Sequence, residues 1–340
     1  MAGTQDVTVE EVARTAGVSA STVSRVFNSN PDIADETAAM VRSVAARLGY
    51  RRVTLRGRPA AWKTQRTNTI AFLVPDVHQE ALRTVLMGRI LEGIESSLRA
   101  QRLSLMLAGL SANRQLPACL EPPCVDGLIV RMVGLGASLS RLERQLPDLP
   151  RVWVLEPPAP PAKGDLVHVD NDAVARLALT HFLEVGCRAV AVWNPLPQHP
   201  AARARASAFC KVASASAVDT TVHAGRGGLA RLAQGLRSAR KPVGLFVPIG
   251  DEQVDALYHL LERLTLRTGR DVLVVACDND LARAAALDPQ GSSIDIRGEE
   301  IGKAATELLV WHLANPHEPA RRVLVEPRLV AHKGDRVGGH

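Results

Sequence analysis

The feature that most constrains the fold of this chain is an alternation of strand-like and helix-like stretches that begins at residue 69. Thr69 to Pro75 reads TIAFLVP, a compact apolar run of strand length, and residues 80–101 carry leucine and isoleucine at helical spacing. Further strand-like runs lie at 103–108, 125–130, 152–155, 189–193, 243–247 and 272–276, and further helical patterns at 173–185, 201–213 and 252–264. Strands that alternate with helices predict parallel sheets joined by right-handed crossovers. We therefore predict an α/β core of two doubly wound parallel-sheet subdomains, with a ligand cleft where their strand ends face each other.

The stretch from Val7 to Asn28 has a different pattern, which predicts two short helices joined by a tight turn. Apolar residues recur at helical spacing before Gly17, and glycine supplies the left-handed backbone that often ends a helix. Ser19 is placed to cap the second helix. A helix, a glycine turn and a capped helix predict a helix-turn-helix, whose second helix enters the DNA major groove. The same pattern also fits an ordinary helical hairpin in a protein core.

The distribution of charge favours the DNA-binding interpretation. The formal net charge of +6 is modest, but the stretch from Thr37 to Pro75 contains no acidic residue. The basic residues in it are Arg42, Arg47, Arg51, Arg52, Arg56, Arg58, Lys63 and Arg66. A cluster of one sign beside a helix-turn-helix is typical of a surface that binds phosphates, whereas a solvated face usually intersperses acids with bases.

Two stretches of the chain resemble a known family. AGVSASTVSRVFN, followed by TAAMVRSVAARLGY at Thr37 to Tyr50, resembles the DNA-binding headpiece of the lactose-repressor/galactose-repressor (LacI/GalR) family. The matching features are the AGVS turn, the TVSRVxN run and a third helix that ends in LGY. The resemblance continues more weakly through most of the chain. It implies a helix-turn-helix headpiece at 1–50, a hinge at 51–68 and a periplasmic-sugar-binding-protein-like effector domain at 69–340. The expected subdomains are about 69–168 with 293–318, and 169–292 with 319–340.

The second helix of the headpiece carries the candidate DNA contacts. Its first exposed residues, Ala20 and Ser21, and Arg25 one turn later are expected to read bases in the major groove, as the resemblance also implies. An alanine methyl suits a thymine methyl, serine can bond several bases, and arginine can fork onto guanine or hold a phosphate. The candidate phosphate contacts are Ser19, Thr22, Ser24 and Asn28. Ser19 also fits a helix cap, and Asn28 fits the end of the helix equally well.

The hinge departs from the pattern of the family. Relatives have a short helix of the type PNxxAxxL, whose leucine inserts into the minor groove, but this chain reads RRVTLRGRPAAWKTQRTN and places Trp62 at the leucine position. Arg56, Gly57, Arg58 and Pro59 resemble the core of an AT-hook, an extended segment that lies along an A/T-rich minor groove. Three interpretations stay open: minor-groove contact by RGRP, wedging of Trp62 between base steps, or a flexible basic linker.

Arg205 and Asp278 are the leading candidates for effector contacts. Arg205 lies in RASAF and Asp278 in VVACDND, and both match positions at which family members grip an effector, although an alanine replaces the glycine of the family's RxxG[FW]. An arginine and an aspartate that converge can hold vicinal sugar hydroxyls. Asp76, Trp193 and Phe246 lie at or near strand ends and could line the same cleft, with an aromatic ring stacked on a sugar. Ordinary loop or core packing is the alternative for these three.

The remaining features exclude several protein classes. Five scattered cysteines show no metal-ligand spacing, and no apolar run approaches the roughly 18 residues of a membrane span. The sequence lacks the common nucleophile, Walker and zinc-protease motifs. We predict a cytoplasmic, non-enzymatic homodimer without cofactor or metal. It would bind double-stranded operator DNA with an affinity set by a small effector, a carbohydrate or its derivative. The alternatives are a constitutive DNA-binding protein whose core only dimerises, and an enzyme fused to a headpiece.

Overall fold

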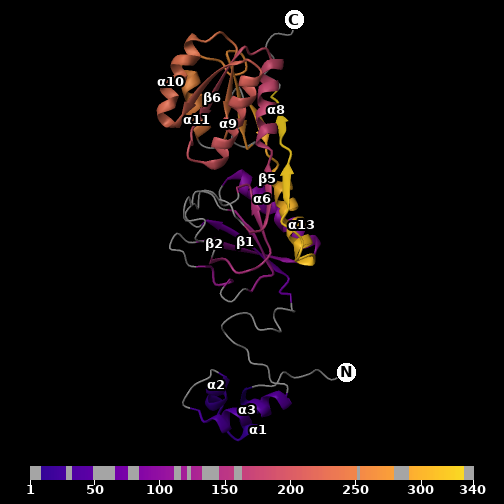
Figure 1. Ribbon diagram of the computed structural model, residues 1–340. Helices are drawn as coiled ribbons and strands as arrows, with labels where there is room; N and C mark the ends of the chain where they lie inside the picture. The colour runs from indigo at the N-terminus through magenta and orange to yellow at the C-terminus, as the bar shows by residue number, and fades with distance from the viewer. Residues whose placement is uncertain are drawn as a thin grey trace. The chain divides into compact units, whose positions relative to one another are not determined.

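The computed structural model describes residues 9–27, 33–48, 66–75, 84–110, 116–120, 124–131, 145–156, 163–250, 253–278 and 291–332. The chain forms two compact units, Met1–Arg66 and Thr67–His340 (Figure 1). The first unit contains the predicted headpiece, and the second contains the predicted effector domain. Among the described residues, no helix is long and apolar enough to cross a membrane.

The headpiece consists of three helices around a small apolar core. These helices are α1 (Val9–Ala16), α2 (Ala20–Phe27) and α3 (Asp35–Leu48). Gly17 adopts a φ of 67°, and the N–H of Val18 donates to the carbonyl of Ala13 at 3.0 Å, which ends α1. The buried side chains of the core are Val12, Ala13, Ala16, Val23, Val26, Ala38, Val41, Val44 and Ala45. The predicted turn and periodicity therefore produce a packed helix-turn-helix.

The effector domain contains two sheets, each with six described strands (Figure 1). The first has the order β11-β5-β4-β3-β1-β2 and consists of β1 (Thr69–Pro75), β2 (Ser104–Leu110), β3 (Gly127–Val130), β4 (Arg151–Val154), β5 (Asp165–Val169) and β11 (Arg322–Val325). The second has the order β12-β10-β9-β8-β6-β7 and consists of β6 (Ala189–Asn194), β7 (Asp219–Ala224), β8 (Val243–Val247), β9 (Val272–Cys277), β10 (Ser292–Asp295) and β12 (Arg328–Val330). Only the pair of β10 and β12 is antiparallel among the described pairs, so the predicted doubly wound α/β class is confirmed.

In the first subdomain, helices α6 (Val85–Ala100) and α13 (Gly298–Ala314) pack together against one face of the sheet. The two helices touch backbone to backbone through glycines. A Cβ added at Gly93 would lie 2.0 Å from the carbonyl oxygen of Glu299, and one at Gly302 would lie 2.2 Å from that of Ile90. The opposite face of the sheet packs Leu73, Leu128 and Trp153 into a separate apolar cluster.

In the second subdomain, helices cover both faces of the sheet (Figure 1). Helices α8 (Asn171–Glu184) and α9 (Pro200–Ala215) place Phe182 and Phe209 in the core that also holds Phe246. Helices α10 (Gly225–Ser238) and α11 (Gln253–Arg263) cover the other face with leucines that pack on Trp193. This layering leaves the ends of the strands as the places where polar residues can gather.

The chain crosses between the subdomains after β5, after β10 and after β11. The strand pairing differs from the expected partition in two places. Strand β10 extends the second sheet to Asp295, and β11 pairs in parallel with β5 in the first sheet, whereas the sequence predicts that residues 319–340 belong to the second subdomain. The reason is that β11 is a four-residue edge strand in which Val325 alone is buried, so its short apolar run at 323–325 does not show which sheet it joins.

Candidate functional sites

The candidate major-groove residues lie on one exposed face of α2. Ala20, Ser21 and Arg25 are all exposed, whereas Val23 and Val26 on the same helix are buried in the headpiece core. This arrangement allows the three residues to reach base edges without disturbing the packing of the helices.

The start of α2 gathers hydroxyl groups. The Oγ of Ser19 accepts a hydrogen bond from the N–H of Thr22 at 3.1 Å, so the predicted cap is present. The same oxygen lies 2.7 Å from the hydroxyl of Ser21 and 2.8 Å from that of Thr22. Hydroxyls and free N–H groups at a helix N-terminus are well suited to contact a phosphate.

Several candidates lie outside the described residues. They are the side chain of Ser24, together with Asn28, Arg56, Gly57, Arg58, Pro59, Trp62 and Asp76. The hinge interpretations therefore stay predictions.

Arg205 and Asp278 lie in direct contact in the second subdomain. Nη1 of Arg205, on α9, donates to Oδ1 of Asp278 and to the carbonyl of Pro248, both at 3.0 Å. The Arg205 side chain is only 3% exposed and that of Asp278 11%. The sequence resemblance thus identified two residues that the fold brings together from positions 73 residues apart.

The backbone around Asp278 explains how this contact is held. Asp278 follows β9 with a φ of 79°, and its N–H donates to the carbonyl of Ile294 on β10 at 3.0 Å. A Cβ added at Gly250 would lie 2.0 Å from the carbonyl oxygen of Cys277, so the segment after β8 passes directly against the end of β9. These contacts fix the position from which the Asp278 carboxylate meets Arg205.

Two further charged residues approach this pair from the first subdomain. Arg131 directly follows β3, and Glu156 follows β4. Burial lowers the pKa of Arg131, an effect that Glu156 and Asp278 oppose and Arg205 reinforces. Burial also raises the pKa of Glu156, and Arg131 and Arg205 oppose that shift. Arg131, Glu156, Arg205 and Asp278 therefore form an interdomain charge cluster, in which both subdomains contribute one arginine and one acid.

The ionisation of Arg205 is secured by its neighbours. Its burial would lower the pKa, but Asp278 and Cys277 outweigh that effect and raise it. Burial raises the pKa of the Cys277 thiol to about 12, so this thiol is neutral near pH 7. Arg205 therefore stays cationic with Asp278 as its counter-ion.

The interdomain charge cluster contains buried polar atoms that lack a hydrogen-bond partner within the described part of the chain. They are Nη1 of Arg131, Oε2 of Glu156 and Nε of Arg205. Glu156 as a whole is only partly buried, but this oxygen is inaccessible to solvent. Buried polar groups are normally paired, because leaving one unpaired costs about 1–3 kcal/mol. A ligand with matching groups would recover that energy.

Arg131 and Glu156 were not identified from the sequence. Each follows an apolar strand, VDGLIV before Arg131 and VWVL before Glu156. The carboxyl ends of parallel strands meet at one edge of a sheet, and polar residues placed there are candidates for ligand contacts. That rule, applied to the first subdomain, would have identified both.

The two aromatic candidates belong to the core instead. Trp193 is 1% exposed, and its Nε1 donates to the carbonyl of Gly225 at 3.2 Å. Phe246 is fully buried and stacks on Phe209 with ring centroids 4.7 Å apart. In this structure neither ring has a face open to a sugar, because both residues point from buried strands into the layers of helices.

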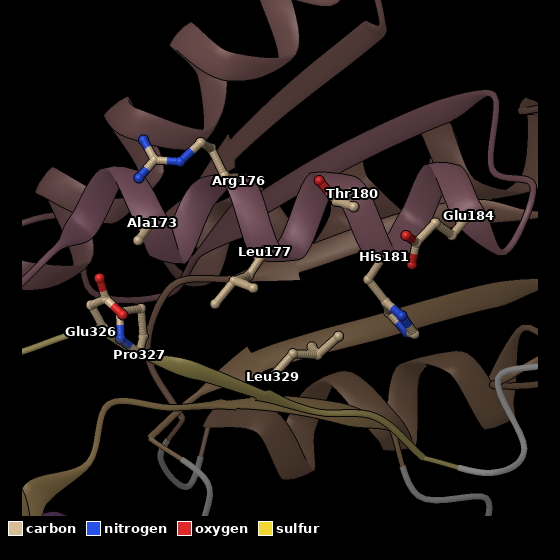
Figure 2. Close-up of a pocket in the computed structure, with 9 residues that line it drawn as sticks. All are labelled: Ala173, Arg176, Leu177, Thr180, His181, Glu184, Glu326, Pro327 and Leu329. Atoms are coloured by element: carbon tan, nitrogen blue, oxygen red, sulfur yellow. The ribbon is translucent and has the colours of Figure 1, made fainter.

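A concave site lies between α8 and β12. It is an open groove of about 420 Å³, and Figure 2 shows Leu177 and His181 directed from α8 toward Leu329 on β12. Arg205 and Asp278 do not line this groove.

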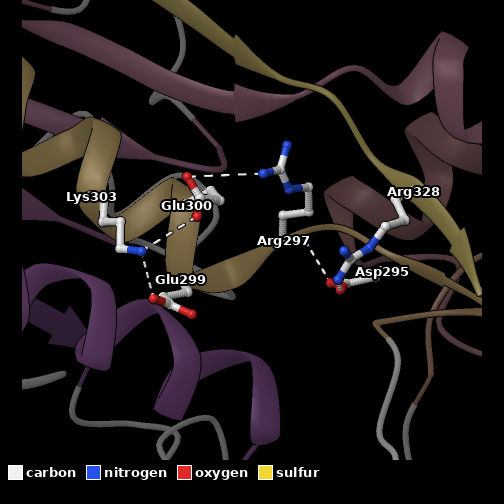
Figure 3. A network of polar contacts seen from close by, with 6 residues as sticks. All are labelled: Asp295, Arg297, Glu299, Glu300, Lys303 and Arg328. Atoms are coloured by element: carbon white, nitrogen blue, oxygen red, sulfur yellow. Dashed lines mark hydrogen bonds and ion pairs between the residues drawn. The ribbon is translucent and has the colours of Figure 1, made fainter.

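A polar network lies at the crossover between the subdomains (Figure 3). Oδ2 of Asp295 accepts from Nη2 of Arg328 at 3.0 Å, its Oδ1 accepts from the N–H of Arg297 at 2.7 Å, and Nη1 of Arg89 lies 3.6 Å away. Asp295 therefore links α6 of the first subdomain to β10 and β12 of the second.

Comparison with known proteins assigns the chain to a family. Residues 8–52 match the family described as bacterial regulatory proteins, lacI family, and residues 179–333 match the periplasmic binding protein-like domain. The HTH-type transcriptional regulator PtxS of Pseudomonas plecoglossicida is 30% identical over 337 residues, which cover 95% of this chain and 94% of the relative. The chain belongs to the lacI family. The ribose operon repressor of Escherichia coli K12 is 25% identical over 336 residues, covering 95% of this chain and 98% of that protein.

Solved structures of lacI-family proteins share the fold. The lac repressor dimer bound to operator and the anti-inducer ONPF has a TM-score of 0.63 and 20% identity, and covers 98% of this chain and 100% of that chain. The CelR–cellobiose complex has a TM-score of 0.67 and 22% identity, and the match covers 96% of this chain and 99% of that chain. The chain is therefore a DNA-binding transcriptional regulator and not an enzyme, as its sequence predicted.

Proposed function

We propose that this regulator binds a pseudo-palindromic operator as a homodimer, and that a small hydroxylated effector, a sugar or sugar derivative, changes its affinity for DNA. The observation that carries the effector proposal is the contact between Arg205 and Asp278, opposed by Arg131 and Glu156 from the other subdomain. The ribose operon repressor and the cellobiose complex among its relatives support a carbohydrate. The lac repressor dimer on its operator supports the homodimer. Since its target is operator DNA, the protein acts in the cytoplasm.

On DNA, each headpiece would place α2 in the major groove of one half-site. Ala20, Ser21 and Arg25 would contact bases, while Ser19 and Thr22 would hold phosphates beside them. Ser24 and Asn28 complete the proposed phosphate contacts. Because phosphate contacts release counterions, affinity should fall steeply as salt rises.

The hinge would add minor-groove contacts. The RGRP sequence from Arg56 to Pro59 would suit an A/T-rich groove in an extended conformation, and Trp62 could wedge between base steps next to it. Operator selection from random DNA, with the intact protein and with Arg56→Ala/Arg58→Ala, tests this part. We expect a symmetric site whose A/T-rich preference is lost in the variant. Equal A/T preference in both proteins would contradict hinge readout, and the absence of any selected site would contradict the operator proposal.

Effector control would act through the arrangement of the two subdomains. Arg131 and Arg205 are buried, so an effector would enter when the subdomains separate and be held when they close. A ligand shifts such an equilibrium only by its difference in affinity for the two states. Contacts to residues from both subdomains would supply that difference.

The alternative is a constitutive DNA-binding protein whose core only dimerises. The two functions are distinguished by measuring operator affinity by fluorescence anisotropy with and without a panel of sugars, sugar acids and sugar phosphates. We expect at least one compound to change the affinity of the native protein and not that of Asp278→Asn. The matched control is Asp271→Asn, because Asp271 also pairs with an arginine, Arg267, at 3.1 Å in the same subdomain. Loss of the response in the control as well would remove Asp278 from the site.

A further inference from the structure

We infer that Cys119 and Cys124 form a site of reversible oxidation, at which a hydroperoxide links the two thiols in a disulfide that acts on the entry of the hinge into the effector domain. The inference goes beyond effector control, because it concerns a covalent modification within the first subdomain. Both residues lie directly before β3, and both are thiols in the structure.

The backbone holds the two cysteines at the separation that a disulfide requires. The N–H of Cys124 donates to the carbonyl of Cys119 at 2.7 Å. Residues bonded in this way in an antiparallel pair have Cα atoms about 5.5 Å apart, and disulfides span Cα separations of roughly 4.4–6.8 Å. The neighbouring Leu120 and Val125 are 3% and 0% exposed and pack in one apolar cluster, so the chain is fixed beside each cysteine.

The two side chains also interact with each other. Burial raises the pKa of Cys119, a backbone hydrogen bond at Cys119 opposes that shift, and the charge of a Cys124 thiolate reinforces it. Cys119 is partly buried, whereas Cys124 is exposed. A peroxide therefore reaches Cys124 first, and Cys119 is the thiol that reacts with the oxidised form of Cys124.

Hydrogen peroxide is the only co-reactant that the oxidation needs. The Cys124 thiolate attacks one oxygen of the peroxide and becomes a sulfenic acid, while the O–O bond breaks and the departing hydroxide takes up the proton that the thiol had released. The sulfur of Cys119 then attacks the sulfur of Cys124. The S–O bond breaks, and the hydroxyl leaves as water with the proton of the Cys119 thiol. The two sulfurs lose two electrons, which reduce the peroxide to water, and a dithiol reductant reverses the change.

The site adjoins the residues at which the hinge enters the effector domain. The carboxylate of Asp126, two residues after Cys124, accepts from the N–H groups of Thr67 at 2.8 Å and Asn68 at 2.7 Å. The N–H of Asp126 donates to the carbonyl of Thr69 at 2.8 Å. A disulfide would draw the Cβ atoms of the two cysteines to about 3.8 Å and pull on the chain directly before this anchor. Oxidation should therefore displace the start of β1 and weaken operator binding.

Mass spectrometry of the full chain treated with hydrogen peroxide tests the site. Trypsin releases both cysteines in one peptide, residues 115–131. We expect this peptide to lose two hydrogen atoms and to resist alkylation at both sulfurs, and dithiothreitol should reverse both changes. The loss should disappear in Cys124→Ser. It should persist in Cys210→Ser, the matched control, because Cys210 is partly buried on α9 in the other subdomain.

Fluorescence anisotropy measures the consequence for DNA binding. The oxidised native protein should bind its selected operator at least about fivefold more weakly than the reduced protein, with recovery after dithiothreitol. Cys124→Ser should bind the operator with the same affinity before and after peroxide. This variant also controls for oxidation of methionine, which peroxide modifies as well.

The outcomes separate the site, its consequence and the proposed function. An unmodified peptide, or a sulfinic acid at Cys124 without a link to Cys119, overturns the inference. Unchanged operator affinity of the linked protein, or a loss of affinity that persists in Cys124→Ser, overturns the action on the hinge. If neither the oxidised nor the reduced protein selects an operator, the proposed function fails, whereas the mass of the peptide still decides the site.

Discussion

At the scale of single residues, the dominant interaction of the effector domain is the buried pair of Arg205 and Asp278. Their hydrogen bond of 3.0 Å lies almost out of reach of solvent, so neither group can be hydrated if its partner is lost. Removing one member of a buried pair typically destabilises a protein by about 3–5 kcal/mol, because an uncompensated charge remains. Function and stability are therefore coupled at this site.

This coupling predicts different results for two substitutions of Asp278. Asp278→Ala should lower the free energy of unfolding by about 3 kcal/mol and abolish the effector response, since the buried Arg205 loses its counter-ion. Asp278→Asn retains an acceptor oxygen and should cost less, while still losing the response. Urea denaturation and effector titration measure the two effects. Equal stability of the native protein and Asp278→Ala would contradict this account of the pair.

Glu156 predicts a dependence of stability on pH. Its pKa is raised by burial above the ordinary value for glutamate, so the folded state binds its proton more tightly than the unfolded state does. The stabilisation from this group is therefore complete below the ordinary pKa and is lost as the pH rises through the raised one. Arg131, Arg205 and Asp278 are the charged groups that act on it.

Glu156→Gln should remove this contribution. Unfolding free energies measured by urea titration from about pH 4 to 7 should fall less with rising pH in Glu156→Gln than in the native protein. Parallel curves for the two proteins would show that Glu156 is not the titrating group.

At the scale of elements, α2 separates stability from recognition. Ser19 caps the helix through the N–H of Thr22 at 3.1 Å, whereas Arg25 is exposed. Ser19→Ala should lower headpiece stability by about 1 kcal/mol, because a donor at the start of α2 loses its acceptor. Arg25→Ala should leave the melting temperature unchanged and weaken operator binding. Thermal denaturation followed by circular dichroism measures the stability of both variants, and fluorescence anisotropy measures their operator affinity. A large loss of stability in Arg25→Ala would contradict the separation of the two roles.

The close crossing of α6 and α13 requires glycine at Gly93 of α6 but not at Gly88 of the same helix. Gly93→Ala would place a methyl group 2.0 Å from a backbone oxygen of Glu299 and should destabilise by about 1–3 kcal/mol. Gly88→Ala is the matched control, because an added Cβ there meets nothing within 4 Å, and it should be neutral or stabilising by up to about 1 kcal/mol. Similar effects of the two changes on chemical denaturation would refute the close contact.

At the scale of the whole effector domain, the segments that cross between the subdomains are tied together by Asp295. Its carboxylate contacts Arg328 on β12 (Figure 3) and Arg89 on α6, so it joins the two halves that an effector would move. A change in the relative position of the subdomains must alter or strain these contacts.

In Asp295→Ala, an effector should therefore change the affinity for operator DNA by a smaller factor than in the native protein. The affinity of the variant for the effector itself should change less. Lys303→Ala is the control, because the ion pairs of Lys303 with Glu299 and Glu300 lie within α13 (Figure 3). Anisotropy titrations with and without effector give both quantities. An unchanged factor in Asp295→Ala would show that this network does not transmit the effector signal.

The sequence by itself determined the classes of the longer elements and the family. The three headpiece helices and strands such as β1 and β8 follow from local periodicity, because burial repeats at the spacing of a helix or fills a short run completely. The family resemblance also identified Arg205 and Asp278 as candidate site residues, and their side chains form a hydrogen bond in the structure. The sheet to which β11 belongs was beyond this reasoning, because its apolar run at 323–325 does not show which strand it pairs with.

Only the tertiary structure decided which residues face each other. Trp193 and Phe246 lie near strand ends in the sequence but pack inside the layers, because the side on which a strand residue points depends on the register of the whole sheet. Arg131 and Glu156 oppose Arg205 and Asp278 because the crossovers bring the strand ends of two sheets together. Local patterns encode burial and turns, whereas the meeting of charges from distant segments is set by the order in which the strands assemble.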